Sequence, residues 1–274
     1  MATDPLTRLV LPATSVADDV GYVALHDLGA VMSGSNYRLI GGHMVMALVA
    51  RWQLGAELYR QTQDTDLGVP PVAVQEPTIV DALLTLGYQR RAGNRFGRPV
   101  DDIPVRLIGR AALPPEATID ILIAGYTTKL RNDVKFKEHL VTTEVPGLST
   151  ALQRPPINMT LQLHRLNGQV LDVDIAVADE VSALVLKAHA TRVRAKATDI
   201  VDIWRCLEIC NAAAIGPKTF IGPDALTAAT RIRELFSDRS GQGMSALLEE
   251  QGLAVIAANV RYTRIRALIQ RVIG

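Results

Sequence analysis

The sequence predicts an α+β protein in which residues 1–180 form a mixed sheet with flanking helices and residues 181–274 form a helical domain. Three observations support this prediction. A short apolar segment, a Gly-Gly pair and a helical spacing of apolar residues follow one another between residues 37 and 58. Asn167-Gly168, between two strand-like segments, is typical of a hairpin turn. Beyond Asp179 the apolar residues keep a helical period to the C-terminus.

The elements of the first part follow from local periodicity. Residues 37–40 are expected to form a strand that ends at Gly41-Gly42, and a helix is expected from residue 44 to residue 58. Polar and apolar residues alternate over residues 62–69, as they do in a half-buried strand. The other expected elements are, in order, a helix at 78–86, a Gly-rich basic stretch at 87–100, strands at 105–107 and 118–123, an irregular connection at 134–156, and hairpin strands at 161–166 and 170–177 with a type I′ turn.

Composition excludes several classes of protein. Of the 274 residues, 48% are hydrophobic and 21% are charged, unlike disordered or collagen-like chains. Two cysteines, Cys206 and Cys210, are too few for a secreted disulfide scaffold, so a reducing, cytoplasmic location is expected. The first residues lack the pattern of a signal peptide, and the longest apolar run near the front, residues 44–50, is too short to cross a bilayer. No membrane association is expected.

Charge is divided unevenly along the chain. The formal net charge is +1, from 29 basic and 28 acidic residues. Residues 181–274 hold 13 basic and 8 acidic residues, a net charge of +5, so the first 180 residues carry −4. A basic C-terminal part favours an anionic partner such as a triphosphate or RNA.

Three acidic residues and a glycine pair form the strongest chemical signal. Gly41-Gly42, between a strand and a helix, lets backbone N–H groups approach an anion. Asp64 and Asp66 stand two apart in an expected strand, so their carboxylates lie on one face and favour Mg²⁺. Asp120 is a single charge in an apolar strand, which is costly unless the carboxylate is paired or metal-bound. An ordinary turn and a solvated strand edge are the alternative interpretations.

Together these residues resemble a known family. Ile40-Gly41-Gly42-His43, the DxD pair of Asp64 and Asp66, and Ile119-Asp120-Ile121 are similar to the pattern of the nucleotidyltransferase superfamily. A second set resembles the KxxA…R…KDxxD signature of AbiEii-type nucleotidyltransferase toxins, the group that includes the mycobacterial MenT enzymes. Its members are Lys187, Ala190, Arg192, Lys196, Asp199 and Asp202. The resemblance spans about residues 37–205, with two departures: His43 follows the glycine pair, and two residues separate Lys196 from Asp199.

The resemblance implies a role for each matching residue. Asp64, Asp66 and Asp120 would bind Mg²⁺ in a two-metal site, and Asp120 would help to deprotonate the attacking hydroxyl. Lys187 would contact the triphosphate oxygens and is the fourth implied catalytic residue. The residues implied in nucleotide binding are Gly41, Gly42, His43, Thr62, Lys187, Asp199 and Asp202. The structural alternatives are a helix lysine with its charge in solvent, and ion pairs of Asp199 and Asp202 with Arg192 or Arg194.

The implied activity is transfer of a nucleoside monophosphate from an NTP, ATP included, to a hydroxyl acceptor, with release of pyrophosphate. The resemblance further implies the toxin of a toxin–antitoxin pair, with RNA or tRNA as acceptor and a cognate antitoxin as partner. Two alternatives stay open. One is an enzyme that modifies an antibiotic of the aminoglycoside or lincosamide type, and the other is a pseudoenzyme that binds a nucleotide or a protein partner.

Other charged or reactive groups are weaker candidates. Asp172 and Asp174 form a second DxD pair, but no glycine turn and helix precede it, so an exposed strand is the simpler interpretation. Cys206 and Cys210 lack zinc-site spacing and are expected to pack as buried thiols. Two arginine clusters are interpreted as solvated basic surfaces that would also suit phosphates; they comprise residues 90, 91, 95 and 98, and residues 261, 264, 266 and 271.

Overall fold

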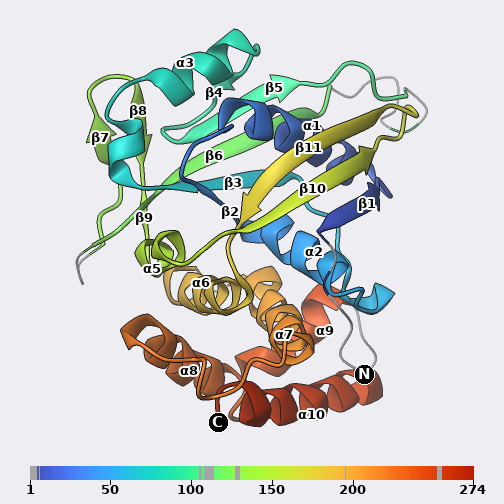
Figure 1. Ribbon diagram of the computed structural model, residues 1–274. Coiled ribbons are helices and arrows are strands. Elements are labelled where there is room, and N and C mark those ends of the chain that lie inside the picture. The colour runs from blue at the N-terminus through green and yellow to red at the C-terminus, as the bar shows by residue number, and fades with distance from the viewer. Residues whose placement is uncertain are drawn as a thin grey trace.

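The computed structural model describes residues 5, 7–104, 107, 114–126, 130–194, 196–251 and 255–274. Within these ranges the chain forms one large mixed sheet, a small two-stranded sheet and a set of helices. The α+β class with a helical C-terminal region is therefore confirmed. In Figure 1 the large sheet fills the upper half of the molecule, and helices α6 (Glu180–Val193) to α10 (Val255–Val272) lie below it. A division into two domains at residue 180 stays a prediction.

The large sheet combines parallel and antiparallel pairs. Its strand order is β1-β10-β11-β2-β3-β6-β5-β4, and β9 also pairs with β6, while β7 and β8 form the small sheet. The pairs β1–β10, β11–β2, β3–β6 and β6–β9 are parallel. The strands are β1 (Arg8–Pro12), β2 (Arg38–Ile40), β3 (Asp64–Val69), β4 (Gln89–Arg90), β5 (Arg95–Pro99), β6 (Glu116–Ala124), β7 (Val134–Phe136), β8 (Leu140–Thr142), β9 (Glu144–Val145), β10 (Ile157–His164) and β11 (Val170–Val177).

The helices connect the sheet to the C-terminal region. Helix α1 packs against β3, β6 and β11, whereas α2 packs against β2 and β3 and also contacts α6 and α7. Helix α2 therefore lies between the sheet and the helical region. The other helices are α1 (Val16–Val31), α2 (Gly41–Arg51), α3 (Thr78–Thr85), α5 (Leu148–Gln153), α7 (Ala197–Ala212), α8 (Pro223–Leu235) and α9 (Gln242–Gln251), with short 3-10 helices at Ala56–Leu58 and Pro71–Val74.

The elements with strong local signals are confirmed. Strands β2, β3 and β6 lie where the sequence predicts strands, and α3 matches its predicted helix within one residue. Strands β10 and β11 form the predicted antiparallel hairpin. Its turn is not type I′, because within the turn only Gly168 has a positive φ, of 89°. The N–H of Gly168 donates to the carbonyl of Arg165 at 3.0 Å, so a single left-handed glycine completes the turn.

Several expectations were wrong. The basic stretch at 87–100 contains β4 and β5, and the connection at 134–156 contains β7, β8, β9 and α5. The helix expected to reach residue 58 ends at Arg51 and is followed by a separate 3-10 turn. Strand β1 and helix α1 were not predicted. Of the strand expected at 105–107, residues 105 and 106 lie outside the described residues.

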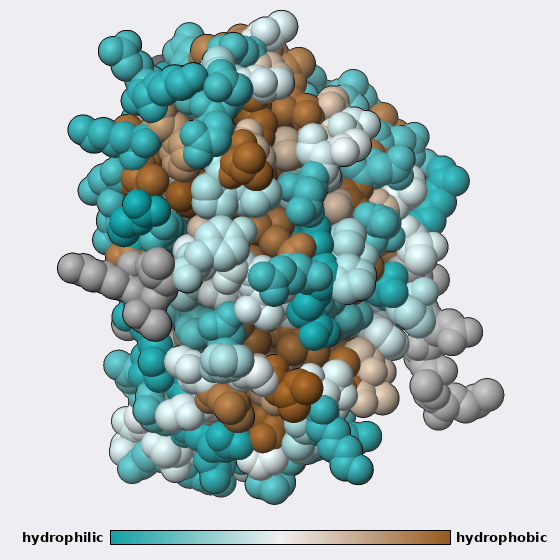
Figure 2. Space-filling model, turned by 60° about the vertical axis from the view of Figure 1, so that its left-hand side comes forward, coloured by the Kyte–Doolittle hydropathy of each residue, from teal (hydrophilic) through white to brown (hydrophobic). Residues whose placement is uncertain are grey.

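Buried apolar side chains form one continuous core that runs from the sheet into the helical region, through residues such as Leu25, Ile119 and Leu207. On the face shown in Figure 2, hydrophilic residues cover most of the surface, and apolar residues form small, separate patches. Among the helices that the structure describes, none has the length and apolar character that a membrane span requires.

Candidate functional site

Two neighbouring strands bring the three predicted aspartates onto one face of the sheet. Strands β3 and β6 are parallel, and their register pairs Asp66 with Asp120 and Asp64 with Thr118. Because successive side chains of a strand point to opposite faces, Asp64, Asp66 and Asp120 share one face. The Thr118 hydroxyl donates to Oδ1 of Asp64 at 2.7 Å. The three carboxylates therefore lie on the same face of two adjacent strands.

The glycine pair is explained by side chains that reach it from the β3 segment. Gly41, the first residue of α2, has a φ of 72°, and a β-carbon there would lie 1.8 Å from Oδ2 of Asp66. A β-carbon on Gly42 would lie 2.3 Å from the Thr62 hydroxyl oxygen. No side chain caps this N-terminus of α2. The Asp66 carboxylate therefore lies directly against the start of the helix, and only glycine leaves room for it.

Arg95 supplies the positive charge on this face. Its Nε donates to Oδ1 of Asp120 at 3.1 Å, its Nη2 donates to Oδ2 of Asp120 at 2.7 Å, and Nη2 also lies 3.2 Å from Oδ2 of Asp64. The antiparallel register of β5 with β6, which pairs Arg95 with Asp120, brings the side chain there. The hydrogen bond to Asp120 and the two negative charges raise the pKa of the guanidinium. Nothing in the sequence pattern distinguished Arg95 from its basic neighbours.

Asp66 differs from the other two aspartates. Among the described residues, no side chain donates a hydrogen bond to its carboxylate. Burial, and then the negative charge of Asp120, raises the pKa of Asp66 to about 6, although Lys187 and Arg194 lower it in part. A carboxylate in this environment gains free energy from a nearby cation.

A cavity of about 260 Å³ lies over Asp66, between the sheet and the helical region. Its polar lining comes from β3, from β9 and the residue before it, from α6 and its C-cap, and from the start of α7, so residues far apart in the sequence meet there. Of the implied site residues, Gly41, Asp66, Lys187 and Asp199 line it. The other lining residues are Ile40, Met44, Leu122, Thr143, Glu144, Val145, Pro146, Leu186, Ala190, Val193 and Arg194.

The second sequence motif forms a buried ion-pair network behind this cavity. The ammonium of Lys187 lies 2.8 Å from Asp202 and 3.2 Å from Asp199. Arg60 and Arg205 each lie 2.9 Å from Asp202, whose side chain is fully buried. Although burial alone would lower it, these aspartates raise the pKa of Lys187, so the lysine stays charged.

This network bears on the two interpretations of the motif. Asp202 contacts three cations and is absent from the lining of the cavity. Asp199 pairs with Arg194 at 2.9 Å as well as with Lys187, and Asp199, Arg194 and Lys187 all line the cavity. The structural pairing of Asp199 and Asp202 with basic residues is thus present, and nucleotide contact by either aspartate stays a prediction. Arg60, Arg194 and Arg205 are members that the resemblance did not assign.

His43 and Thr62 lie elsewhere. Both line a separate cavity of about 550 Å³, and the His43 ring packs against Gly21 of α1. Burial lowers the pKa of His43 to about 4, so the ring is neutral at pH 7. Its Nε2 has no hydrogen-bond partner within the described residues. Contact of His43 or Thr62 with a nucleotide stays a prediction.

Asp64, Asp66 and Asp120, which we call the acidic face, offer the kind of oxygen ligands that Mg²⁺ binds, but their side chains are not arranged around one point. In the part of the chain that the structure describes, no three His, Cys, Asp or Glu side chains converge as ready metal ligands. Arg95 lies between Asp64 and Asp120 instead. Asp66 nevertheless presents carboxylate oxygens beside Asp120, and such oxygens are the ligands that Mg²⁺ prefers. Magnesium binding stays a prediction.

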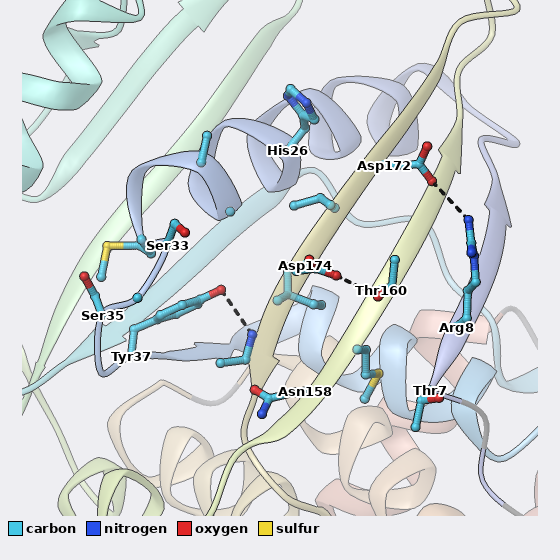
Figure 3. Close-up of a pocket in the computed structure, with 18 residues that line it drawn as sticks. Thr7, Arg8, His26, Ser33, Ser35, Tyr37, Asn158, Thr160, Asp172 and Asp174 are labelled. Carbon is cyan, nitrogen blue, oxygen red and sulfur yellow. Dashed lines mark hydrogen bonds and ion pairs between the residues drawn. The ribbon is translucent and has the colours of Figure 1, made fainter.

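The second DxD pair lies in a shallow cavity of about 630 Å³ next to the C-terminal end of α1 (Figure 3). Asp174 accepts a hydrogen bond from the Thr160 hydroxyl at 2.6 Å, and Asp172 lies 3.9 Å from Arg8. Both aspartates are exposed on β11. This arrangement matches the exposed strand that the sequence favours.

The basic clusters are mostly engaged within the chain. Arg91 pairs with Glu116, Arg98 with Asp27, and Arg90 donates to backbone carbonyls. On α10, Arg264 pairs with Glu208, Arg266 donates to the Phe236 carbonyl, and the Arg261 guanidinium lies 3.9 Å from the Trp204 ring centre. These arginines are therefore not the freely solvated surfaces that the sequence suggested. Cys206 and Cys210 are buried, and burial raises the pKa of both thiols, as expected for packed residues.

The sequence matches no known protein-family profile and no curated protein. Among solved structures, the chain is similar to an antigenic nucleotidyltransferase-like protein from Paracoccidioides brasiliensis. The sequence identity is 16% and the TM-score is 0.45, over 86% of this chain and 94% of that chain. A likeness this distant supports no conclusion about activity.

Proposed function

We propose that the protein is a Mg²⁺-dependent nucleotidyltransferase that moves a nucleoside monophosphate from an NTP to a hydroxyl acceptor. The observation that carries the proposal is the parallel register of β3 and β6. This register places Asp66 beside Asp120, while Gly41 holds the start of α2 against Asp66. Acidic ligands and a helix N-terminus are the two features that a nucleoside triphosphate with its metal requires.

The phosphate end of the NTP, together with its metal, would occupy the 260 Å³ cavity, whose charged lining is Lys187 and Arg194 beside Asp66, Glu144 and Asp199. Lys187 and Arg194 both line it, and backbone N–H groups at the start of α2 carry partial positive charge. The Arg194 side chain is 55% exposed, so its planar guanidinium can contact phosphate oxygens. The buried ammonium of Lys187 acts as a point charge. Leu122, Met44 and Val193 supply an apolar wall that suits the base or ribose.

Asp64, Asp66 and Asp120 would hold Mg²⁺, which when bound offsets the negative charge of the phosphates. Asp120 accepts the proton of the acceptor hydroxyl while the hydroxyl oxygen forms a bond to the α-phosphorus. The bond between the α-phosphorus and the bridging oxygen breaks, and the electron pair leaves with pyrophosphate. Lys187 and Arg194 stabilise the charge on this leaving group.

The acceptor we favour is RNA, tRNA included. Arg95, Arg131 and Arg194 have half-exposed or exposed guanidinium groups near the carboxylates or the cavity lining. An anionic acceptor gains from these charges, whereas a cationic aminoglycoside is repelled by them. The role as a toxin with a cognate antitoxin rests on the sequence resemblance alone.

A second candidate function is nucleotide binding without transfer. The observation that favours it is Arg95, because this guanidinium pairs with Asp64 and Asp120, two of the three implied metal ligands. Such a protein would bind an NTP in the cavity and leave it unchanged.

Both candidates are tested by incubating the purified protein with each α-labelled NTP, Mg²⁺ and total RNA, or with an aminoglycoside or a lincosamide. We expect label on RNA that is lost in Asp66→Asn. Label on an antibiotic alone would replace the RNA acceptor. NTP binding with no label transfer to any acceptor would favour the pseudoenzyme.

A further inference from the structure

Arg95 occupies an unusual position among the acidic residues of the sheet. One nitrogen, Nη2, lies 2.7 Å from Oδ2 of Asp120 and 3.2 Å from Oδ2 of Asp64. Its Nε lies 3.1 Å from the second oxygen of Asp120. A single guanidinium therefore bridges two carboxylates that come from different strands.

This position is set by the backbone and does not depend on the ion pairs. Strand β5 pairs with β6 over five residues, from Arg95 opposite Asp120 to Pro99 opposite Glu116. The next residue, Phe96, is fully buried in the core and anchors the strand. The bridge can therefore open without loss of the ladder.

The three side chains of the bridge differ in exposure. The side chains of Arg95 and Asp64 are 40% and 49% exposed, whereas that of Asp120 is 12% exposed. An arginine with this exposure has room to rotate toward solvent, while the backbone of both aspartates is held by the pairing of β3 with β6. Two carboxylates this close need a cation, and only the arginine can be exchanged for another one.

We propose that Arg95 is a built-in counterion that competes with a divalent cation for Asp64 and Asp120, so that metal binding requires Arg95 to release both carboxylates. Arg95 thereby sets the affinity of the acidic face for metal and partly neutralises the two carboxylates when no metal is bound. Once released, the guanidinium stands at the edge of the same face, where an anionic substrate gains from its charge.

This inference rests on the proposed function, because that function identifies the aspartates as metal ligands. Its test measures metal binding rather than catalysis, so the two can fail separately. If an Arg95 variant transfers label but binds metal with unchanged affinity, the proposed function is retained and the counterion proposal is overturned. If the variant binds metal more tightly but no label is transferred to any acceptor, the counterion proposal is retained and the proposed function is overturned.

The experiment compares Mn²⁺ binding to the full chain, by electron paramagnetic resonance and by calorimetry, in the wild type, Arg95→Gln and Arg91→Gln. Arg91 is the matched control, since it lies on the same hairpin, is 35% exposed, and pairs with Glu116 instead. We expect Arg95→Gln to lower the Kd for Mn²⁺ by about tenfold or more, because it removes a positive charge in contact with two ligands. Arg91→Gln should change the Kd by less than about twofold, as its charge lies farther from these carboxylates.

A second variant keeps the test decisive if Arg95→Gln folds poorly. Arg95→Lys retains a charge, but an ammonium lacks the planar fork that spans two carboxylates, so we expect an intermediate Kd. In both variants Mn²⁺ should raise the Tm more than it does in the wild type. The counterion proposal is overturned if either variant, with folding verified by circular dichroism, has a Kd for Mn²⁺ equal to or higher than that of the wild type.

Discussion

A β-carbon on Gly41 would lie 1.8 Å from Oδ2 of Asp66, so the first residue of α2 and the second aspartate of β3 share space that only glycine leaves open. Gly41 also has a φ of 72°, a conformation in which other residues are strained. The glycine and the aspartate thus form one structural unit. The missing β-carbon of Gly41 leaves the space that the Asp66 carboxylate fills.

Replacing Gly41 with alanine tests this unit. We expect Gly41→Ala to lower the free energy of unfolding by roughly 2–4 kcal/mol, from backbone strain plus the collision with Asp66. Urea unfolding measures the change. Gly34→Ala is the control, because Gly34 has a similar φ of 74° but nothing within 4 Å of the added carbon. An equal loss in both variants would show that strain alone accounts for Gly41.

The two DxD pairs allow a direct comparison. Asp66→Asn should reduce nucleotide transfer at least about a hundredfold, because it removes a charge from the proposed metal site. Asp174→Asn, in the exposed pair on β11, should leave transfer within about twofold of the wild type. Initial rates with a labelled NTP distinguish them. If Asp66→Asn and Asp174→Asn lost transfer activity equally, the assignment of the site to β3 would be contradicted.

Arg194 provides a test of substrate affinity. Arg194→Ala should raise the KM for the NTP by about tenfold, because the guanidinium lines the cavity and is placed to contact phosphate. Arg192, in the last turn of α6 and absent from that lining, is the control. If kcat fell while KM stayed constant, Arg194 would act after binding.

The buried network should dominate stability. Asp202→Ala leaves the charges of Lys187, Arg60 and Arg205 without their shared partner, and we expect a loss of about 3–5 kcal/mol in unfolding free energy. The exposed pair of Glu76 and Lys137 is the control, since Glu76→Ala should cost less than about 1 kcal/mol. Urea unfolding of both variants at pH 7 measures the difference. A loss below 1 kcal/mol in Asp202→Ala would contradict the network's role.

His43 should make stability fall in mild acid. Its folded pKa of about 4 lies below the ordinary value of 6.5, so between these values the unfolded chain binds the proton first. The contribution of neutral His43 to the free energy of unfolding is fully present above pH 6.5. This free energy should drop by roughly 3 kcal/mol as the pH falls toward 4. Unfolding experiments at pH 7, 5.5 and 4.5 should show a smaller slope in His43→Gln. His26→Gln, at a side chain that is 42% exposed, should keep the wild-type slope.

The sequence by itself determined the features that depend on neighbouring residues. Strand β2 and the existence of a helix after it follow from local periodicity, and so does the shared face of Asp64 and Asp66; α2 itself begins at Gly41, three residues before the expected start. The hairpin of β10 and β11 follows from Asn167-Gly168, although its turn type does not. These features were predictable because a strand repeats every two residues and a helix every 3.6.

Some elements contain buried polar residues whose ion-pair partners lie far away in the sequence, and local periodicity did not predict these elements. Helix α1 buries Asp19 and Asp27. Their partners are Arg165, at 2.7 Å from Asp19, and Arg98, at 2.6 Å from Asp27. Without these partners a buried carboxylate is costly, and the partners lie far away in the sequence, so local pattern could not show that they compensate this cost.

Tertiary structure decided the rest of the site. The register of β3 with β6 joins residues 54 apart, and the register of β5 with β6 brings Arg95 to Asp120. The same tertiary packing places Asp202 in a closed network and His43 in another cavity. The sequence states which charges the chain carries. Which charges neutralise one another depends on distances of about 3 Å, and only the packing of strands and helices fixes these distances.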